Sequence, residues 1–268
     1  MTTSPTATAP LDAGVTGPPP ARRRADLQRW AVPAGSVLVA VVAVLIWWLA
    51  SLAYFVVPSP GDTLKALISS FGDERYLINV QSTAIASVLA LAASVVAGLL
   101  IGVAFGLIPW LSRGFEPLLV ALNGVPKIVL YPVLLLMLGM GTTSKVALGT
   151  IIGVFPVMMN VAAGIRDMPP IYRRLAKSLE ASRWQTFRHI IVPAIRRPAM
   201  VGIRLAVSLS TVGVVLAEMF ATRYGLGRVI LASHSAGQYP RMLATVVLLV
   251  VVAFVATMLL WRLERRMR

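Results

Sequence analysis

Four polar side chains interrupt long apolar runs of the sequence, and they are Lys127, Tyr131, Asn160 and Glu218. A charged side chain within a membrane-spanning helix costs roughly 2.5–3.5 kcal/mol on insertion scales, so each one is a candidate for function. Lys127 lies between Pro126 and Pro132, which break the helical hydrogen bonds and leave carbonyl groups free to line a cavity. We predict that the four residues line a substrate pathway, where the Lys127 cation steers an anion.

Structural roles for the same residues stay open. Lys127 could form an ion pair with Glu218 or extend toward the membrane surface. Asn160 could make a hydrogen bond between helices, which is the commoner use of amides in membrane helices. Tyr131 could pack against its neighbours instead of stacking on a ring of the substrate. The sequence does not decide between these roles and substrate contact.

The residues that would indicate catalysis are missing from the sequence. It has no cysteine and two histidines, and neither histidine has ligand-like neighbours. The segment from Gly139 to Lys145 has the letters of a phosphate-binding loop in the wrong order. No catalytic triad or carboxylate pair is visible. We therefore expect no enzyme activity, no metal site and no cofactor in this chain.

The composition is that of a membrane protein. Of 268 residues, 57% are hydrophobic and 13% are charged, whereas soluble domains carry about 25% charged residues. Six apolar runs are each long enough for the roughly 20 residues that a bilayer requires. They lie at 35–57, 82–109, 116–139, 145–165, 199–220 and 241–262, and a short turn at 112–114 separates the second from the third. We predict an all-α polytopic protein with six transmembrane helices.

The segments outside these runs complete the predicted organisation. Residues 1–30 contain Pro, Thr, Gly and Ala with almost no bulky apolar side chain, which predicts a disordered tail ahead of a membrane domain at 31–268. A cleaved signal peptide is the rival interpretation, but its apolar region would be about 7–15 residues long. Between the first two runs, Leu64, Leu67, Ile68 and Phe71 recur at helical spacing and predict an amphipathic surface helix.

The positive charges indicate the orientation. The net charge of +15 would suggest nucleic acid in a soluble protein, but here the Lys and Arg residues gather between apolar runs. Most of them fall on one side of the predicted spans, on the segments before the first run, between the fourth and fifth, and after the sixth. Cytoplasmic loops carry the excess of Lys and Arg. We therefore predict cytoplasmic termini, contact with membrane lipid and no nucleic-acid partner.

The loop at 166–197 is long, basic and ordered by pattern. Pro169 and Pro170 suit a helix start, and an apolar residue then recurs every fourth position from Ile171. Ser182 and Gln185 have the spacing of a capping box that opens a second helix, which we expect Pro193 to end. Its apolar stripe is Trp184, Phe187, Ile190 and Ile191, and the polar side carries Arg173, Arg174, Lys177, Arg183 and Arg188. Two such helices could lie in the lipid interface or dock a partner protein.

The loop resembles the coupling loop of binding-protein-dependent ABC importer permeases. The family pattern is Glu-Ala-Ala, three residues, Gly, nine residues, Ile, any residue and Leu-Pro. Ile190 and Val192-Pro193 match its end, which places Glu180 at the glycine and Arg174-Leu175-Ala176 at Glu-Ala-Ala. Flanking segments, including PSPGDTL, Ala217-Glu218-Met219 and Gly225-Leu226-Gly227, are similar to the sulfonate, nitrate and taurine branch. The likeness runs from about residue 58 to the C-terminus.

The resemblance implies a docking site for an ATPase. The residues that it implicates are Arg174, Leu175, Leu179, Glu180, Ser182, Arg183, Trp184, Gln185, Phe187 and Arg188. If the family's glycine has a positive φ, Glu180 costs on the order of 1 kcal/mol in that position. Because Arg174 replaces a glutamate, we expect a dedicated ATPase whose docking groove is more acidic than usual.

The resemblance also implies a function and its partners. We expect the permease subunit of an ABC importer in a bacterial cytoplasmic membrane, working as a homodimer with two ATPase subunits that bind ATP and Mg. An external binding protein would supply a small anion such as a sulfonate, taurine or nitrate, and would meet the segment from Tyr224 to Arg241, which caps the pathway. A heteroaromatic nutrient such as a thiamine precursor is an alternative substrate. An ion-coupled secondary transporter, using Glu218 and the break at Pro126, is an alternative of another class.

Overall fold

The computed structural model describes residues 22–266, and it divides into two compact units after Tyr54. The first unit contains helix α1 (Arg22–Ala53), whose part from Gly35 to Ala53 is long and apolar enough to cross a membrane. Residues 22–30, which we predicted as the end of the tail, are thus helical. The rest of the predicted tail, residues 1–21, lies outside the described residues.

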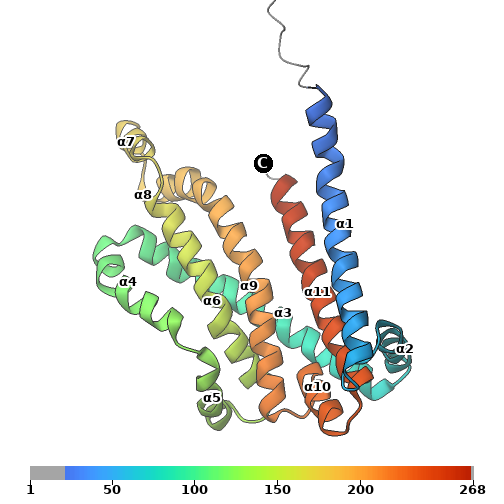
Figure 1. Cartoon of the computed structure of the whole chain (residues 1–268). Helices are drawn as coiled ribbons and strands as arrows, with labels where there is room; N and C mark the ends of the chain where they lie inside the picture. Colours follow the sequence, from blue (N-terminus) through green and yellow to red (C-terminus); the bar gives the residue numbers. More distant parts are fainter. Residues whose placement is uncertain (1–21, 267–268) are drawn as a thin grey trace, which may run out of the picture. The chain divides into compact units, whose positions relative to one another are not determined.

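The second unit is an assembly of helices in which the described residues form no strand. Two long helices, α6 and α9, lie side by side, with α7 and α8 at one end of them and α10 at the other (Figure 1). The elements in chain order are α2 (Pro60–Phe71), α3 (Glu74–Leu107), α4 (Pro109–Gly124), the 3₁₀ turn η1 (Lys127–Leu130), α5 (Tyr131–Leu138), α6 (Thr142–Arg166), α7 (Pro170–Ser178), α8 (Arg183–Thr186), the π-helix η2 (Phe187–Ile191), α9 (Val192–Ala221), α10 (Leu226–Ser235) and α11 (Tyr239–Arg266).

Five of the six predicted spans correspond to continuous helical segments that are long and apolar enough to cross a membrane, in the part of the chain that the structure describes. The exception is the predicted span at 116–139, which is divided among α4, η1 and α5. The division falls at Pro126, as the paired prolines predicted, because proline has no N–H to continue a helix. The predicted turn at 112–114 is wrong: these residues are helical, and the chain turns earlier, at Ile108, since Pro109 starts α4.

Small residues allow α3 and α6 to pack closely. One stripe of α3 has a small, buried residue at every fourth position, and its members are Ala86, Ala90, Ser94, Gly98, Gly102 and Gly106. A Cβ atom built on Gly102 would lie 2.8 Å from the carbonyl oxygen of Met158 in α6. Helices in membranes associate through such stripes, because lipid tails offer apolar side chains no hydrophobic gain from pairing. The stripe therefore fixes α3 against α6, the helix that carries Asn160.

The amphipathic helix predicted from Leu64 and its neighbours is α2. The hydroxyl of Ser59 accepts a hydrogen bond from the backbone N–H of Asp62 at 3.1 Å, and Pro60 occupies the first turn. Leu64, Ile68 and Phe71 are exposed. An exposed apolar face on a capped surface helix is the pattern of a helix that lies in a membrane interface.

Candidate functional site

The basic loop between α6 and α9 begins with α7, and α7 ends in a complete Schellman motif. The N–H of Ala181 donates to the carbonyl of Ala176 at 2.9 Å, and the N–H of Glu180 donates to that of Lys177 at 3.1 Å. In this motif the residue after the C-cap adopts the left-handed conformation that glycine prefers. That residue is Glu180, whose φ of 47° is the only positive value at a non-glycine residue within the described ranges. The condition that we set for strain at the family's glycine position, a positive φ, is therefore met at Glu180.

The second helix of the loop opens on the predicted capping box. The Ser182 hydroxyl accepts from the Gln185 N–H at 3.2 Å, and the Gln185 side chain accepts from the Ser182 N–H at 2.8 Å. We expected this helix to end at Pro193, and that prediction is wrong. The helix continues through η2 into α9, because the wider π turn accommodates a proline that cannot donate a hydrogen bond. α8, η2 and α9 therefore form one helical segment.

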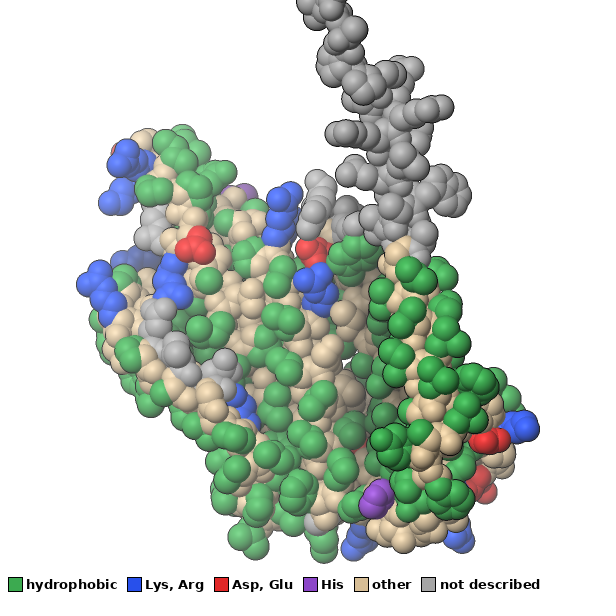
Figure 2. Space-filling model, in the orientation of Figure 1, with side chains coloured by type: hydrophobic (Ala, Val, Ile, Leu, Met, Phe, Trp, Pro, Cys, Tyr) green, Lys and Arg blue, Asp and Glu red, His purple; other side chains and the backbone are tan. Residues whose placement is uncertain are grey.

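The predicted docking residues lie together on this loop and are exposed, except Phe187, which is half-buried. Leu179 and Trp184 are 69% and 66% exposed, although both are large and apolar. Trp184 stacks on Phe187 with ring centroids 5.9 Å apart, and Phe187 in turn packs against the buried cluster around Val157. Lys and Arg side chains gather at the end of the molecule that carries α7, beyond a largely apolar middle (Figure 2). The loop thus presents an anchored apolar surface surrounded by cations.

A cavity of about 1060 Å³ lies beneath this loop, between α6 and the start of α9. Its lining includes Asn160, Tyr172, His189 and Arg197. The side chain of Asn160 donates to the carbonyl of Pro156 in its own helix at 2.8 Å. This hydrogen bond lies within α6, whereas the structural role that we considered for Asn160 was a hydrogen bond between helices. Asn160 also borders the cavity.

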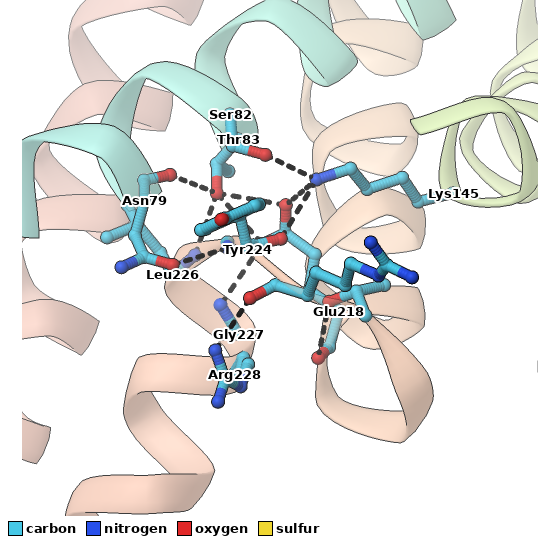
Figure 3. A network of polar contacts seen from close by, with 12 residues as sticks. Asn79, Ser82, Thr83, Lys145, Glu218, Tyr224, Leu226, Gly227 and Arg228 are labelled. Carbon is cyan, nitrogen blue, oxygen red and sulfur yellow. Dashed lines mark hydrogen bonds and ion pairs between the residues drawn. The ribbon is translucent and has the colours of Figure 1, made fainter. Parts of the chain in front are cut away.

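A buried ion pair joins α6 and α9 at the ends that are remote from the 166–197 loop. The ammonium group of Lys145 lies 2.9 Å from a carboxylate oxygen of Glu218, and the two residues are 2% and 1% exposed. Glu218 also accepts from the hydroxyl of Thr83 at 2.8 Å and from the N–H of Gly227 at 3.1 Å. These groups come from α3, α6, α9 and α10, and Figure 3 shows them converging on the carboxylate. Such partners are what a buried charge pair requires to offset the loss of water.

The same network holds the loop that leads into α10. Lys145 donates to the carbonyl of Tyr224 at 3.1 Å, and the N–H of Gly225 donates to the side chain of Asn79 at 2.7 Å. Thr83 accepts from the N–H of Leu226 at 2.8 Å. The start of α10 is therefore fastened to α3 and α6 through backbone groups of residues 224–227 (Figure 3).

The pathway residues predicted from sequence do not form one cluster. Lys127 Nζ lies 4.4 Å from the centroid of the Phe155 ring, a cation–π distance, and the residue is half-buried. Tyr131 is buried and packs against Phe220 with ring centroids 5.9 Å apart. The cation that pairs with Glu218 is Lys145, whereas Lys127 was the partner that we considered. The predicted residues thus lie at different levels along α6.

Sequence reasoning gave no role to Lys145, the first residue of the predicted span at 145–165. It lies in the first turn of α6 and is fully enclosed. A signal was available, because Glu218 is the single carboxylate in its apolar run and a buried carboxylate needs a cation. Lys145, at the same predicted membrane face, was a candidate for that cation.

Comparisons with known proteins agree on one family. Residues 94–268 match the family described as binding-protein-dependent transport system inner membrane component. The taurine transport system permease protein of Escherichia coli (strain K12) is 27% identical over 238 residues, which cover 84% of this chain and 86% of that protein. A riboflavin transport system permease protein of Chloroflexus aurantiacus is 32% identical, with 58% and 59% covered. A nitrate import permease protein of Synechococcus elongatus is 30% identical, with 61% and 57% covered.

A solved structure shows the same fold. The crystal structure of an amino acid ABC transporter with histidines matches 82% of this chain and 96% of its own chain, with a TM-score of 0.51 and 18% sequence identity. The family match covers more than half of the chain and includes the loop, the broken segment and the Lys145–Glu218 pair. The chain therefore belongs to the family of binding-protein-dependent transport system inner membrane components, and it is a multi-pass permease of an ABC importer.

Proposed function

We propose that two copies of this chain form the transmembrane pathway of an importer for a small anion such as a sulfonate, taurine or nitrate. Each copy docks one ATPase subunit on its 166–197 loop, and the ATPase subunits bind ATP and Mg. An external binding protein delivers the substrate, and both termini of the permease face the cytoplasm. The observation that carries the proposal is the rigid, apolar and cation-rimmed surface of the loop.

The loop geometry favours a protein partner over a lipid surface. The Schellman motif at Glu180 and the capping box at Ser182 fix both sides of the turn between α7 and α8, and therefore the angle between the two helices. Amphipathic helices that only lie in a membrane interface need no fixed angle between them. A fixed pair that exposes Leu179 and Trp184 is suited to transmit movement of a docked subunit into α6 and α9.

A second copy is supported by the exposed face of α9. Leu205, Leu209, Val212 and Phe220 are exposed, and they recur at helical spacing along one side of the helix. The described residues of one chain provide five continuous candidate spans, which are few to enclose a pathway. A dimer that brings two such faces together provides twice that number. Homodimers with closed twofold symmetry are also the commonest soluble oligomers, and we infer the same symmetry for this membrane protein.

The anionic substrate is supported by Lys127 and by the relatives. Lys127 is placed at the break between α4 and α5, where backbone groups leave regular helix geometry. Irregular backbone at membrane depth is tolerated where it lines a cavity or is buried in protein. Relatives are permeases for taurine and for nitrate, and both of these molecules carry an anionic oxygen group.

A heteroaromatic nutrient is the second candidate substrate, and the riboflavin permease among the relatives favours it. Ring stacking on Phe155 or Phe220 would then replace attraction to Lys127. The ion-coupled secondary transporter is not retained, because the family match identifies an ABC permease. Glu218, which gave it support, is enclosed and paired with Lys145.

The test is transport in proteoliposomes that contain the permease, its ATPase and its binding protein. Uptake of labelled taurine or nitrate should require ATP, and Lys127→Met should lower it while leaving ATP hydrolysis without substrate unchanged. Lys65→Met, an exposed cation of α2, is the matched control. Riboflavin uptake without anion uptake would select the second candidate. Uptake driven by an ion gradient without ATP would refute the proposal.

A further inference from the structure

A second cavity, of about 580 Å³, opens on the face opposite the coupling loop. It is formed where α3, α10 and α11 begin, and its polar lining includes Arg75, Arg228, Arg241, Ser233 and Gln238. Its volume lies within the range of about 300–1,000 Å³ that is typical of small-molecule sites. None of the pathway residues predicted from sequence lines it.

The cavity has an excess of positive charge. Its described lining contains three arginines and no carboxylate. Arg241 is compensated from outside the lining by Asp73, at 2.7 Å, and this hydrogen bond holds the pKa of the Asp73 carboxyl below its usual value. Within the described residues, Arg75 and Arg228 have no ion-pair partner. Arg228 donates a hydrogen bond to the carbonyl of Arg223 at 2.6 Å, but this neutral partner does not balance its charge. Two guanidinium groups therefore line the cavity without a compensating anion.

The positions of these arginines argue against a role in helix stability. Arg75, Arg228 and Arg241 each lie in the first turn of their helix, in α3, α10 and α11 respectively. The N-terminal end of a helix has partial positive charge, so acidic residues are favoured there and cations are disfavoured. The first turns of α10 and α11 contain no acidic residue. Arg228 and Arg241 thus lie where a cation is unfavourable for the helix, whereas α3 begins with the carboxylates of Asp73 and Glu74. The convergence of three cations at one cavity is explained if an anion binds between them.

We propose that this cavity binds an oxyanion, carried by a free sulfonate or phosphate or by the phosphate of a lipid headgroup. The planar guanidinium group matches two oxygens of a sulfonate, carboxylate or phosphate at once, which makes arginine the preferred residue for such groups. Ser233 and Gln238 add neutral polar groups to the lining. The inference goes beyond the proposed function and does not rest on it, because the site is separate from Lys127 and is defined by its own residues.

The decisive variant is Arg75→Gln/Arg228→Gln in the full-length chain. Arg241 is retained, since its loss would also break the ion pair with Asp73. Lys65→Gln/Arg223→Gln is the matched control: it removes two cations from the same predicted face, and neither residue lines the cavity. Thermal unfolding of the unliganded proteins shows whether each variant is folded, and Arg75→Gln alone serves if the double variant is not.

The readout is the shift in melting temperature in dodecyl maltoside micelles, which contain no phosphate, titrated with sodium methanesulfonate or phosphate at constant ionic strength against chloride. A parallel arm adds phosphatidylglycerol to the micelles. Stabilisation in the first arm identifies a free anion, and stabilisation in the second alone identifies a lipid phosphate. We expect the double variant to weaken the apparent affinity about tenfold or more. Equal stabilisation of the double variant and control, or none in either arm, would overturn the proposal.

Discussion

Lys145 and Glu218 are 2.9 Å apart in a part of the molecule that water does not reach, and they join α6 and α9 at the ends that are remote from the 166–197 loop. Thr83 brings α3 to the same carboxylate, and residues 224–227 bring α10. Because Thr83, Lys145 and Gly227 all bond to this one carboxylate, removal of Glu218 should loosen several elements together. The pair is thus an attachment point for the segment at 224–227.

Glu218→Ala leaves the Lys145 ammonium group buried without its counter-ion. Breaking a buried ion pair on one side costs roughly 3–5 kcal/mol. We therefore expect Glu218→Ala and Lys145→Met to unfold at clearly lower temperatures than the native chain in detergent. The measurement is thermal unfolding followed by tryptophan fluorescence.

The double variant Lys145→Met/Glu218→Ala separates the cost of an orphaned charge from the value of the pair. Replacement of both charges by apolar groups is often close to neutral, so the double variant should be more stable than either single one. Glu264→Ala is a control, because its partner Arg204 is partly exposed and keeps access to water. A double variant whose destabilisation equals the sum of the two single effects would contradict this account.

Glu180→Gly should stabilise the protein. Glu180 holds a φ of 47°, and a side chain there costs on the order of 1 kcal/mol relative to glycine. The Schellman hydrogen bonds involve the backbone alone, so glycine preserves them. Glu180→Ala is the matched control, since it removes the carboxylate but keeps the strained Cβ. We expect a higher melting temperature for the glycine variant only, and an equal gain for alanine would show that charge, not backbone strain, is responsible.

Local signals in the sequence predicted local structure well. The Ser182–Gln185 spacing predicted a capping box, and the prolines near Lys127 predicted a break, because both effects depend on residues adjacent in the chain. The Lys145–Glu218 pair was not predicted, since 73 residues separate its members and only the packing of α6 on α9 brings them together. The continuation of the helix through Pro193 was also not predicted. A π turn depends on the helix that follows it and has no signature in the spacing of residues along the sequence.

Gly102→Ala should destabilise the contact between α3 and α6. The added Cβ would lie 2.8 Å from a backbone carbonyl oxygen that cannot rotate away, so the helices must separate. Overpacking of this kind costs roughly 1–3 kcal/mol. Gly114→Ala in α4 is the control, because a Cβ there meets nothing within 4 Å and alanine is the better helix former. Thermal unfolding of both variants tests this, and equal melting temperatures would show that the stripe is not closely packed in the membrane.

Trp184→Ala should weaken binding of the ATPase. Trp184 is exposed, yet it is held by stacking on Phe187, which gives a rigid aromatic anchor of the kind that dominates protein interfaces. Loss of such an anchor typically costs about 2 kcal/mol or more, and we therefore expect the dissociation constant to rise more than tenfold. The measurement is binding of the purified ATPase to the permease in nanodiscs. Trp110→Ala, an equally exposed tryptophan in α4, should leave binding unchanged.

Arg174→Glu tests the charge of the same surface. Arg174 is exposed on α7, and the loop around it is rich in cations, so the matching groove of the ATPase should be acidic. Reversal of this charge places like charges against each other, which slows association and increases its dependence on salt. We expect slower binding at low ionic strength, with the difference from the native chain shrinking as salt is added. If the ATPase binds the native chain and the variant at the same rate at low salt, its groove is not acidic where it meets Arg174. The ATPase would then not discriminate between permeases at this position.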